Sequence, residues 1–146
     1  MIDKYEENTL EGLEIGQKRK FSVKITESLI NEFAKISGDY NPLHVDEQYA
    51  RSTELGKRIC HGMLLGSFFS KMVGMYLPGK NALYFSQTLN FRSPCFINDE
   101  VSVEGEILEK SMASRIITVK TSIYDLKGKC LVDGIAKVMV RPHLTN

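Results

Sequence analysis

The stretch that decides the fold reads HGMLLGSFFSKMVGMYLPG and covers residues 61–79. Apolar side chains occupy nearly every face of a helix drawn through residues 61–77, Lys71 is its one certain charge, and Pro78-Gly79 ends it. A helix of this kind is buried on most sides, so the rest of the chain must enclose it. Small residues recur at every fourth position, which predicts that another segment closely approaches the helix backbone: Gly62, Gly66, Ser70 and Gly74.

The segments on either side of this helix predict a sheet. Two-residue alternation favours strands at 16–25, 100–108, 117–123 and 132–140, and an aromatic-rich run favours another at 83–91. A turn is expected at 127–129. A first helix is expected to begin after Thr26 as N-cap and to end near Gly38, and Asp46 is expected to cap a short following turn. We therefore predict an α+β fold in one domain over residues 1–146, in which a four-strand antiparallel meander wraps around the long helix.

Composition excludes several classes of protein. The 146 residues are 42% hydrophobic and 25% charged, as in globular domains, and a net charge of +1 with scattered Lys and Arg argues against nucleic-acid binding. The apolar run 63–77 is too short to span a bilayer comfortably, and the polar N-terminus is unlike a signal peptide. Cys60, Cys95 and Cys130 form neither a metal-ligand pattern nor a disulfide framework. We expect a cytoplasmic protein that does not enter the membrane.

The segment SGDYNPLH, residues 37–44, is the candidate catalytic motif. Pro42 disfavours helical geometry at Asn41, and Gly38 permits unusual backbone angles, so we expect a bent segment that is neither helix nor strand. Such a bend can point the Asp39 carboxylate and the His44 imidazole into one small volume, as acid–base chemistry requires. Asn41 is expected to bridge the loop, and it is also a candidate for substrate binding. Taken singly, Asp39 is also an ordinary turn residue and His44 an ordinary buried histidine.

The first turn of the long helix is a second candidate site. Backbone amides there lack intrahelical partners, so Gly62 suits the binding of a developing oxyanion, although a glycine there also permits tight packing. Ser70 either hydrogen-bonds the site or bonds back to its own helix. Cys60 and His61 are interpreted as structural, because adjacent side chains at a helix start diverge.

Two motifs resemble one known family. SGDYNPLH at 37–44, with Ala50 six residues after the histidine, resembles the hydratase-2 motif of MaoC-like proteins, and CHGMLL at 60–65 resembles the start of their central helix. The resemblance extends over roughly 16–140. It implies a hot-dog fold, an antiparallel sheet wrapped around a long central helix. It also implies a homodimer or a dimer of dimers, with one continuous sheet and active sites at the subunit interface.

The resemblance further implies an enzyme, an (R)-specific enoyl-CoA hydratase that adds water reversibly to trans-2-enoyl-CoA and gives (R)-3-hydroxyacyl-CoA. By the same resemblance, Asp39 and His44 carry catalysis, the amide of Gly62 binds the thioester oxygen, and Ser70 lies near the catalytic pair. The acyl-CoA is a substrate, and neither a cofactor nor a metal is implied.

Three other functions stay open at this point: an acyl-CoA thioesterase, a 3-hydroxyacyl-carrier-protein dehydratase, and a non-catalytic acyl-CoA-binding protein. A histidine paired with the aspartate favours proton transfer to C2 over thioester hydrolysis. Leu65, Phe69 and Tyr84 are candidates to line an acyl pocket. The aromatic residues of the strand region are expected in the core or at an interface: Tyr84, Phe85, Phe91 and Phe96.

Overall fold

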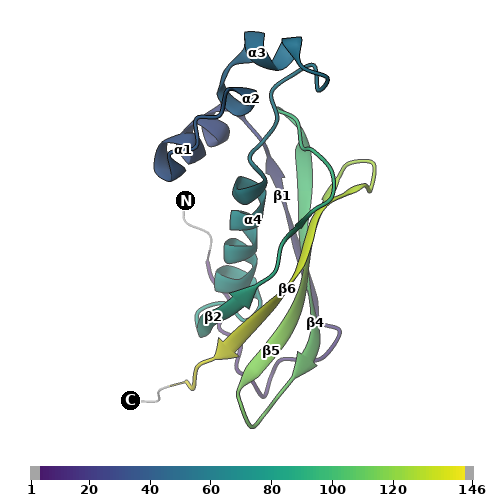
Figure 1. Cartoon of the computed structure of the whole chain (residues 1–146). Helices are drawn as coiled ribbons and strands as arrows, with labels where there is room; N and C mark the ends of the chain where they lie inside the picture. The colour runs from purple at the N-terminus through teal and green to yellow at the C-terminus, as the bar shows by residue number, and fades with distance from the viewer. Residues whose placement is uncertain (1–3, 144–146) are drawn as a thin grey trace.

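A curved antiparallel sheet wraps around one central helix in the computed structural model, which describes residues 4–143 (Figure 1). This arrangement confirms the predicted α+β fold with an enclosed helix. The elements in chain order are β1 (Lys18–Lys24), α1 (Glu27–Ser37), α2 (Pro42–Val45), α3 (Glu47–Ser52), α4 (Gly62–Lys71), the π-helical turn η1 (Met72–Tyr76), β2 (Ala82–Gln87), β3 (Asn90–Phe91), β4 (Glu100–Lys110), β5 (Ile116–Asp125) and β6 (Cys130–Val140).

The order of strands in the sheet differs from the predicted one. It is β1-β4-β5-β6-β2, with β3 also paired to β6. The four-strand meander is therefore wrong, because β2 pairs with β6 and not with β4. The predicted strand 83–91 is also interrupted, since β2 ends at Gln87 and β3 begins at Asn90. Segment 88–99 is too long for a tight hairpin, and it runs beside β6 before it crosses to β4.

The predicted long helix is present, but its last turn is not α-helical. Helix α4 begins at Gly62 with His61 as N-cap, and it continues without a break into η1, which ends at Tyr76. Its inward side chains pack against the apolar face of the sheet, where buried residues alternate along β4 and β6. The buried side chains of α4 and η1 are Leu64, Leu65, Phe69, Met72 and Val73.

The small residues of the central helix have different neighbours, so they are not all explained in the same way. A Cβ built on Gly62 would lie 2.7 Å from the Phe91 ring, and one built on Gly66 would lie 3.0 Å from Leu89. These contacts confirm the predicted close approach, and the approaching segment is the crossing between β2 and β4. At Gly74 a Cβ would meet no atom of the described residues within 4 Å. Packing within this chain therefore does not explain Gly74.

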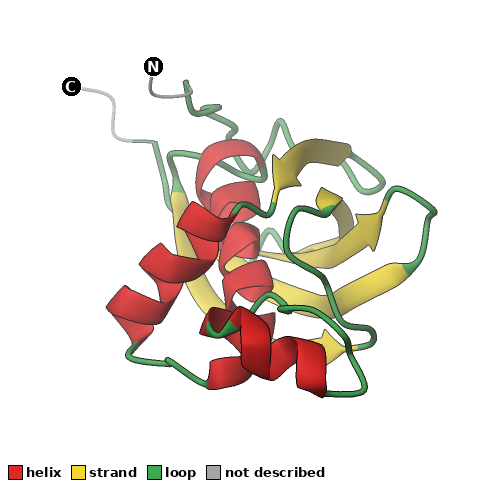
Figure 2. Cartoon of the chain, turned by 90° about the horizontal axis from the view of Figure 1, so that it is seen from above, coloured by secondary structure: helices red, strands yellow, loops and turns green. Residues whose placement is uncertain are grey.

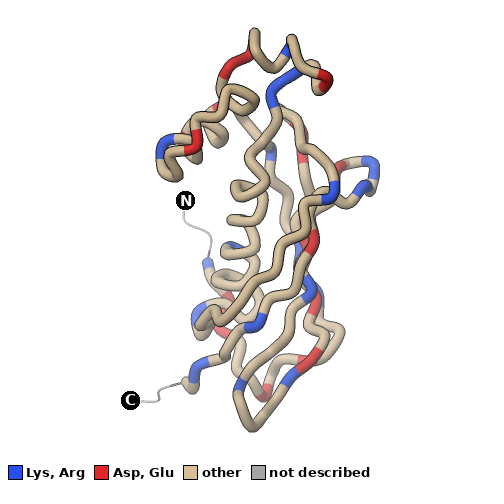
Figure 3. Tube along the Cα trace, viewed as in Figure 1, with Lys and Arg blue, Asp and Glu red and all other residues tan. Residues whose placement is uncertain are grey.

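The three short helices gather over the N-terminal end of α4, as the view from above shows (Figure 2). Helix α1 starts and stops where the sequence predicted: Thr26 Oγ1 accepts a hydrogen bond from Leu29 N, and Gly38 ends the helix with a left-handed φ of 81°. Lys and Arg are spread along the chain among Asp and Glu (Figure 3). Within residues 4–143, no helix is both long and apolar enough to cross a membrane.

Gly134 in β6 gives a test of this packing. A Cβ there would lie 1.8 Å from the Thr88 carbonyl oxygen, which is backbone and cannot rotate away. We expect Gly134→Ala to lower the free energy of unfolding by about 3 kcal/mol, in the range of an overpacked core. Gly74→Ala is the control, and it should be neutral or stabilising by up to about 1 kcal/mol because alanine favours a helix. Urea unfolding measures both, and equal stabilities would contradict the crossing described for segment 88–99.

Candidate active site

Asp39 is held by a series of short hydrogen bonds that follows α1. Asp39 N donates to Ser37 Oγ at 3.1 Å, and Asn41 N donates to Asp39 Oδ1 at 3.1 Å. Leu43 N then donates to Asn41 Oδ1 at 3.0 Å. Each bond joins a side-chain oxygen to the amide two residues later, the pattern of Asx and Ser/Thr turns. Asn41 therefore bridges the loop and caps α2, whereas substrate binding by Asn41 stays a prediction.

His44 lies on a helical turn, α2, and not in the irregular segment that the sequence predicted. Asn41 does keep a non-helical backbone, with φ −51° and ψ 131°, as the following proline favours. Pro42 then begins the helix, because the first position of a helix does not need an amide hydrogen. The prediction erred by applying the effect of Pro42 on the preceding residue to the residues that follow it.

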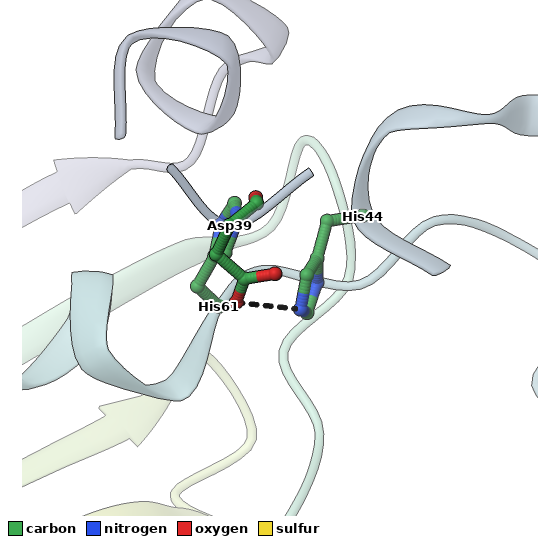
Figure 4. A group of neighbouring side chains, drawn as sticks. All are labelled: Asp39, His44 and His61. Carbon is green, nitrogen blue, oxygen red and sulfur yellow. Dashed lines mark hydrogen bonds and ion pairs between the residues drawn. The ribbon is translucent and has the colours of Figure 1, made fainter. Parts of the chain in front are cut away.

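The structure brings Asp39 and His44 together. His44 Nε2 lies 3.9 Å from Asp39 Oδ2, and the two side chains point toward each other (Figure 4). On the other side of the ring, His44 Nδ1 lies 2.9 Å from the Ile59 carbonyl oxygen. The His44 side chain is 14% exposed and that of Asp39 is 50% exposed, so the pair is open on the aspartate side. Its catalytic role stays a prediction.

His61, interpreted from the sequence as structural, lies in the same site. Its Nε2 is 3.0 Å from the Asp39 carbonyl oxygen, and its ring stacks on that of His44 with 3.9 Å between centroids and 28° between planes. The edge of the ring packs against Phe33 at 4.9 Å. The residue is only 2% exposed, and its Nδ1 has no hydrogen-bond partner among the described residues.

The burial of His61 changes the pKa of its imidazole. Loss of solvent lowers the pKa of the imidazole, and the neighbouring His44 lowers it too, while the Asp39 carbonyl and carboxylate act in the opposite direction. Burial is the largest of these effects. His61 is therefore neutral at the pH of the cell.

Arg58 is a second residue of the site region that the sequence did not indicate. Its buried guanidinium donates from Nε to the His44 carbonyl oxygen at 2.5 Å and from Nη1 to Glu27 Oε1 at 2.9 Å. Nη2 donates to Asn31 Oδ1 at 3.1 Å. One side chain thus fastens α2 to α1. In the sequence, Arg58 is one of many scattered basic residues, and no local pattern distinguishes it.

Gly62 and Ser70 have different relations to the pair. Gly62 follows His61 directly, and no side chain caps this end of α4. The first helical bonds are those from Leu64 N and Leu65 N to the His61 carbonyl, so the Gly62 amide precedes them. Ser70 is exposed and lies two turns further along α4, a rise of ~12 Å. The structure therefore does not bring Ser70 to Asp39 and His44 of the same chain.

The aromatic residues of the strand region differ in burial. Tyr84 is partly buried against the core, and its hydroxyl hydrogen-bonds Gln87. Burial raises its pKa to about 12. Phe85 and Phe91 are more than half exposed in the single chain. Leu65 and Phe69, the other candidates for an acyl pocket, are buried in the core.

Asp39, His44 and His61 are also the group of side chains nearest to a metal-ligand set, with one ligand atom of each within 4.8 Å of the others. Tetrahedral zinc holds its ligands at about 2.0–2.2 Å, which requires a tighter group. The planes of the stacked His44 and His61 rings differ by only 28°, so lone pairs that lie in these planes do not readily converge on one ion. The arrangement suits proton transfer better than metal binding, and the absence of a metal stays a prediction.

The model of the MaoC-like domain family matches residues 11–126, which include Asp39, His44, His61 and Gly62. This chain belongs to the MaoC-like family. Other MaoC-like proteins resemble it over most of its length. It is 40% identical over 128 residues to the (R)-specific enoyl-CoA hydratase of Aeromonas caviae, covering 88% of this chain and 96% of that protein.

Two further relatives extend the comparison. The unliganded R-hydratase PhaJ1 of Pseudomonas aeruginosa superposes with a TM-score of 0.91 at 35% identity, covering 99% of this chain and 96% of that one. A mitochondrial 3-hydroxyacyl-[acyl-carrier-protein] dehydratase of Arabidopsis thaliana is 33% identical over 135 residues, which are 90% of this chain and 80% of the relative. The hot-dog architecture of this MaoC-like chain is thus shared along its whole described length.

The buried His61 predicts how stability depends on pH. Its folded-state pKa lies below the ordinary histidine value of about 6.5, so the unfolded chain binds a proton that the folded chain does not. We expect the free energy of unfolding to fall as the pH drops below about 6.5. Urea unfolding between pH 5 and 8 should show a shallower fall for His61→Gln. The exposed His143→Gln should keep the wild-type dependence, and an equal dependence in all three proteins would contradict a neutral buried His61.

Proposed function

We propose that this chain is an (R)-specific enoyl-CoA hydratase, which adds water reversibly to trans-2-enoyl-CoA and gives (R)-3-hydroxyacyl-CoA. The observation that carries the proposal is the pairing of Asp39 Oδ2 with His44 Nε2 at 3.9 Å beside the uncapped N-terminus of α4. The relative from Aeromonas caviae, which has that name, supports it along nearly its full length.

The hydrogen bonds of His44 define what its free nitrogen can do. A carbonyl oxygen only accepts, so the contact with Ile59 places the proton of the neutral ring on Nδ1. Nε2 then carries a lone pair and faces the Asp39 carboxylate, which is also an acceptor. If one water oxygen lay ~2.8 Å from both His44 Nε2 and Asp39 Oδ2, the angle at that oxygen between the two acceptor atoms would be about 90°. The pair is therefore spaced to bind one water through both of its hydrogens.

Hydration then follows in three events. The bound water loses a proton to the pair as its oxygen attacks C3 of the enoyl thioester. Electron density moves to the thioester oxygen, where the Gly62 amide and the positive end of the α4 dipole stabilise it. A proton returns from the pair to C2. Asp39 and His44 lie together, so they would act from one side of a bound substrate. Both additions would then occur on one face and give a single stereoisomer.

A second copy of the chain completes this proposal. Strand β2 is an edge of the sheet and pairs only with β6 among the described strands. It exposes Leu83 and Phe85, and an apolar edge strand of this kind favours pairing with another chain. A homodimer joined at β2 would extend the sheet and bring the exposed Ser70 and the acyl pocket to a shared interface. Assembly into a dimer of dimers would use further surfaces.

The nature of the thioester carrier defines the second candidate function. The plant relative is named as a dehydratase of acyl-carrier-protein substrates, and the same acid–base pair would serve that reaction in reverse. Neither reaction requires a cofactor or a metal, since proton transfer and oxyanion binding suffice.

The three free cysteines agree with a reducing cytoplasm.

The loss of either acid–base group tests the function. With crotonyl-CoA as substrate, we expect Asp39→Asn and His44→Gln each to lower kcat by about 100- to 10,000-fold, the usual contribution of a general acid or base. Asp46→Asn is the matched control, because Asp46 only caps α3 through Tyr49 N. The loss of enoyl-thioester absorbance gives the rate, and chiral analysis identifies the product.

The other outcomes of this assay separate the alternatives. Release of free coenzyme A by the wild type would indicate a thioesterase. Activity with crotonyl carrier protein but not with crotonyl-CoA would favour the dehydratase. Full activity in both variants would remove Asp39 and His44 from the mechanism, and no reaction with any enoyl thioester would favour a protein that only binds acyl-CoA.

The proposed dimer is tested at Phe85, which is 56% exposed. We expect Phe85→Glu to halve the mass measured by light scattering and to lower the hydratase rate, because a charge would prevent apolar pairing at β2. Leu126→Glu is the control: this leucine is 78% exposed in the turn after β5 and should change neither quantity. A monomeric wild type with full activity would contradict the shared interface.

A further inference from the structure

We infer that His61 is a positioning residue of the Asp39–His44 pair, which fixes the backbone of the aspartate and the ring plane of the histidine from inside the core. The inference rests on the proposed hydratase function of that pair. It begins from the contacts that His61 makes with both residues at once. Neither contact involves the substrate, so His61 acts through its neighbours.

The first contact defines the tautomer of His61. Because the Asp39 carbonyl accepts, the proton of the neutral ring lies on Nε2, 3.0 Å from that oxygen. Nδ1 is then left with a lone pair, buried and without a partner among the described residues. An unpaired buried nitrogen lowers stability, and it calls for a reason other than packing. An apolar side chain would fill the same space without that penalty, so the polar contact with Asp39 is the feature that requires a histidine.

The second contact restricts His44. The His61 ring covers one face of His44 with 3.9 Å between centroids, and the Ile59 carbonyl holds its Nδ1. The two contacts together fix both the plane of the ring and its rotation, which leaves Nε2 directed at Asp39 Oδ2 (Figure 4). Phe33 also contacts the His61 ring in an edge arrangement, with 4.9 Å between ring centroids.

The charge of His61 suits this position. Positive charge that develops on His44 when the pair takes a proton from water would be opposed by a second positive ring at 3.9 Å. His61 stays neutral because it is buried. Besides the Asp39 carboxylate of the pair itself, the Arg58 guanidinium lies against the pair through its hydrogen bond to the His44 carbonyl, and Glu27 balances the charge of Arg58. A neutral ring thus positions His44 without competing for its proton.

Two substitutions separate the two contacts. His61→Phe keeps a ring against His44 but removes the donor to Asp39, and His61→Gln keeps a donor but removes the ring. We expect each to lower kcat by about 10- to 100-fold with KM nearly unchanged, as misplaced catalytic groups do. Val73→Ala is the control: it removes buried volume in η1, far along the helix, and should lower stability while kcat is kept.

Nitrogen-15 NMR of the imidazole rings gives a readout that a purely structural role would not change. In the wild type we expect His44 with its proton on Nδ1 and His61 with its proton on Nε2, the latter neutral at pH 7. In His61→Gln, which lacks the ring, the His44 signals should move toward a mixture of the two tautomers, whereas His61→Phe should keep the His44 tautomer because it keeps the stacked ring. In both variants the acidic limb of the kcat/KM–pH profile should shift.

The outcomes are distinct. Variants with wild-type kcat and an unchanged His44 tautomer would overturn the inference, and so would a wild-type His61 that is charged at pH 7 or carries its proton on Nδ1. This second test needs no variant to fold. If wild type fails to hydrate any enoyl thioester, the proposed function fails, but the tautomer of His44 in His61→Gln still decides whether His61 positions it.

Discussion

The burial of α4 is the constraint on which the rest of the structure depends. Its side chains are apolar on most faces, so the sheet curves around it and the crossing 88–99 closes it on another side, against Gly62 and Gly66. The N-terminal end of the helix emerges under α1, α2 and α3, where Asp39 and His44 lie. Because packing holds the helix along its length, the backbone amides at its N-terminal end that lack intrahelical partners are held in fixed positions.

Local signals in the sequence are sufficient for the ends of the helices but not for the partners of the strands. Thr26, Gly38 and Asp46 act on amides or backbone angles within a few residues, so their effects can be predicted from position alone. The pairing of β2 with β6 depends on contacts between residues as distant in the chain as Ala82 and Val140, about which alternation says nothing. A sheet topology is a property of the whole chain.

The same distinction applies to the site. Asp39 and His44 stand in one short motif, and the amino-acid sequence alone is enough to single out both. His61 and Arg58 are different, because their partners are distant: His61 is 22 positions from Asp39, and Arg58 is 31 positions from Glu27. Adjacent side chains at a helix start do diverge, as expected, but divergence directs His61 toward the loop after α1. Its neighbour Cys60 lies in the core, where the Cys95 thiol and burial raise its pKa.

The two carboxylate oxygens of Asp39 make different contacts, and together these contacts limit which amino acids can replace Asp39. Oδ1 accepts the Asn41 amide and shapes the chain, while Oδ2 faces His44. A glutamate would keep the negative charge, but its longer side chain does not form the two-residue turn, so the motif would lose its shape. An asparagine would keep the turn and lose the charge. The charge that faces His44 and the turn of the backbone therefore both require an aspartate at this position, for independent reasons.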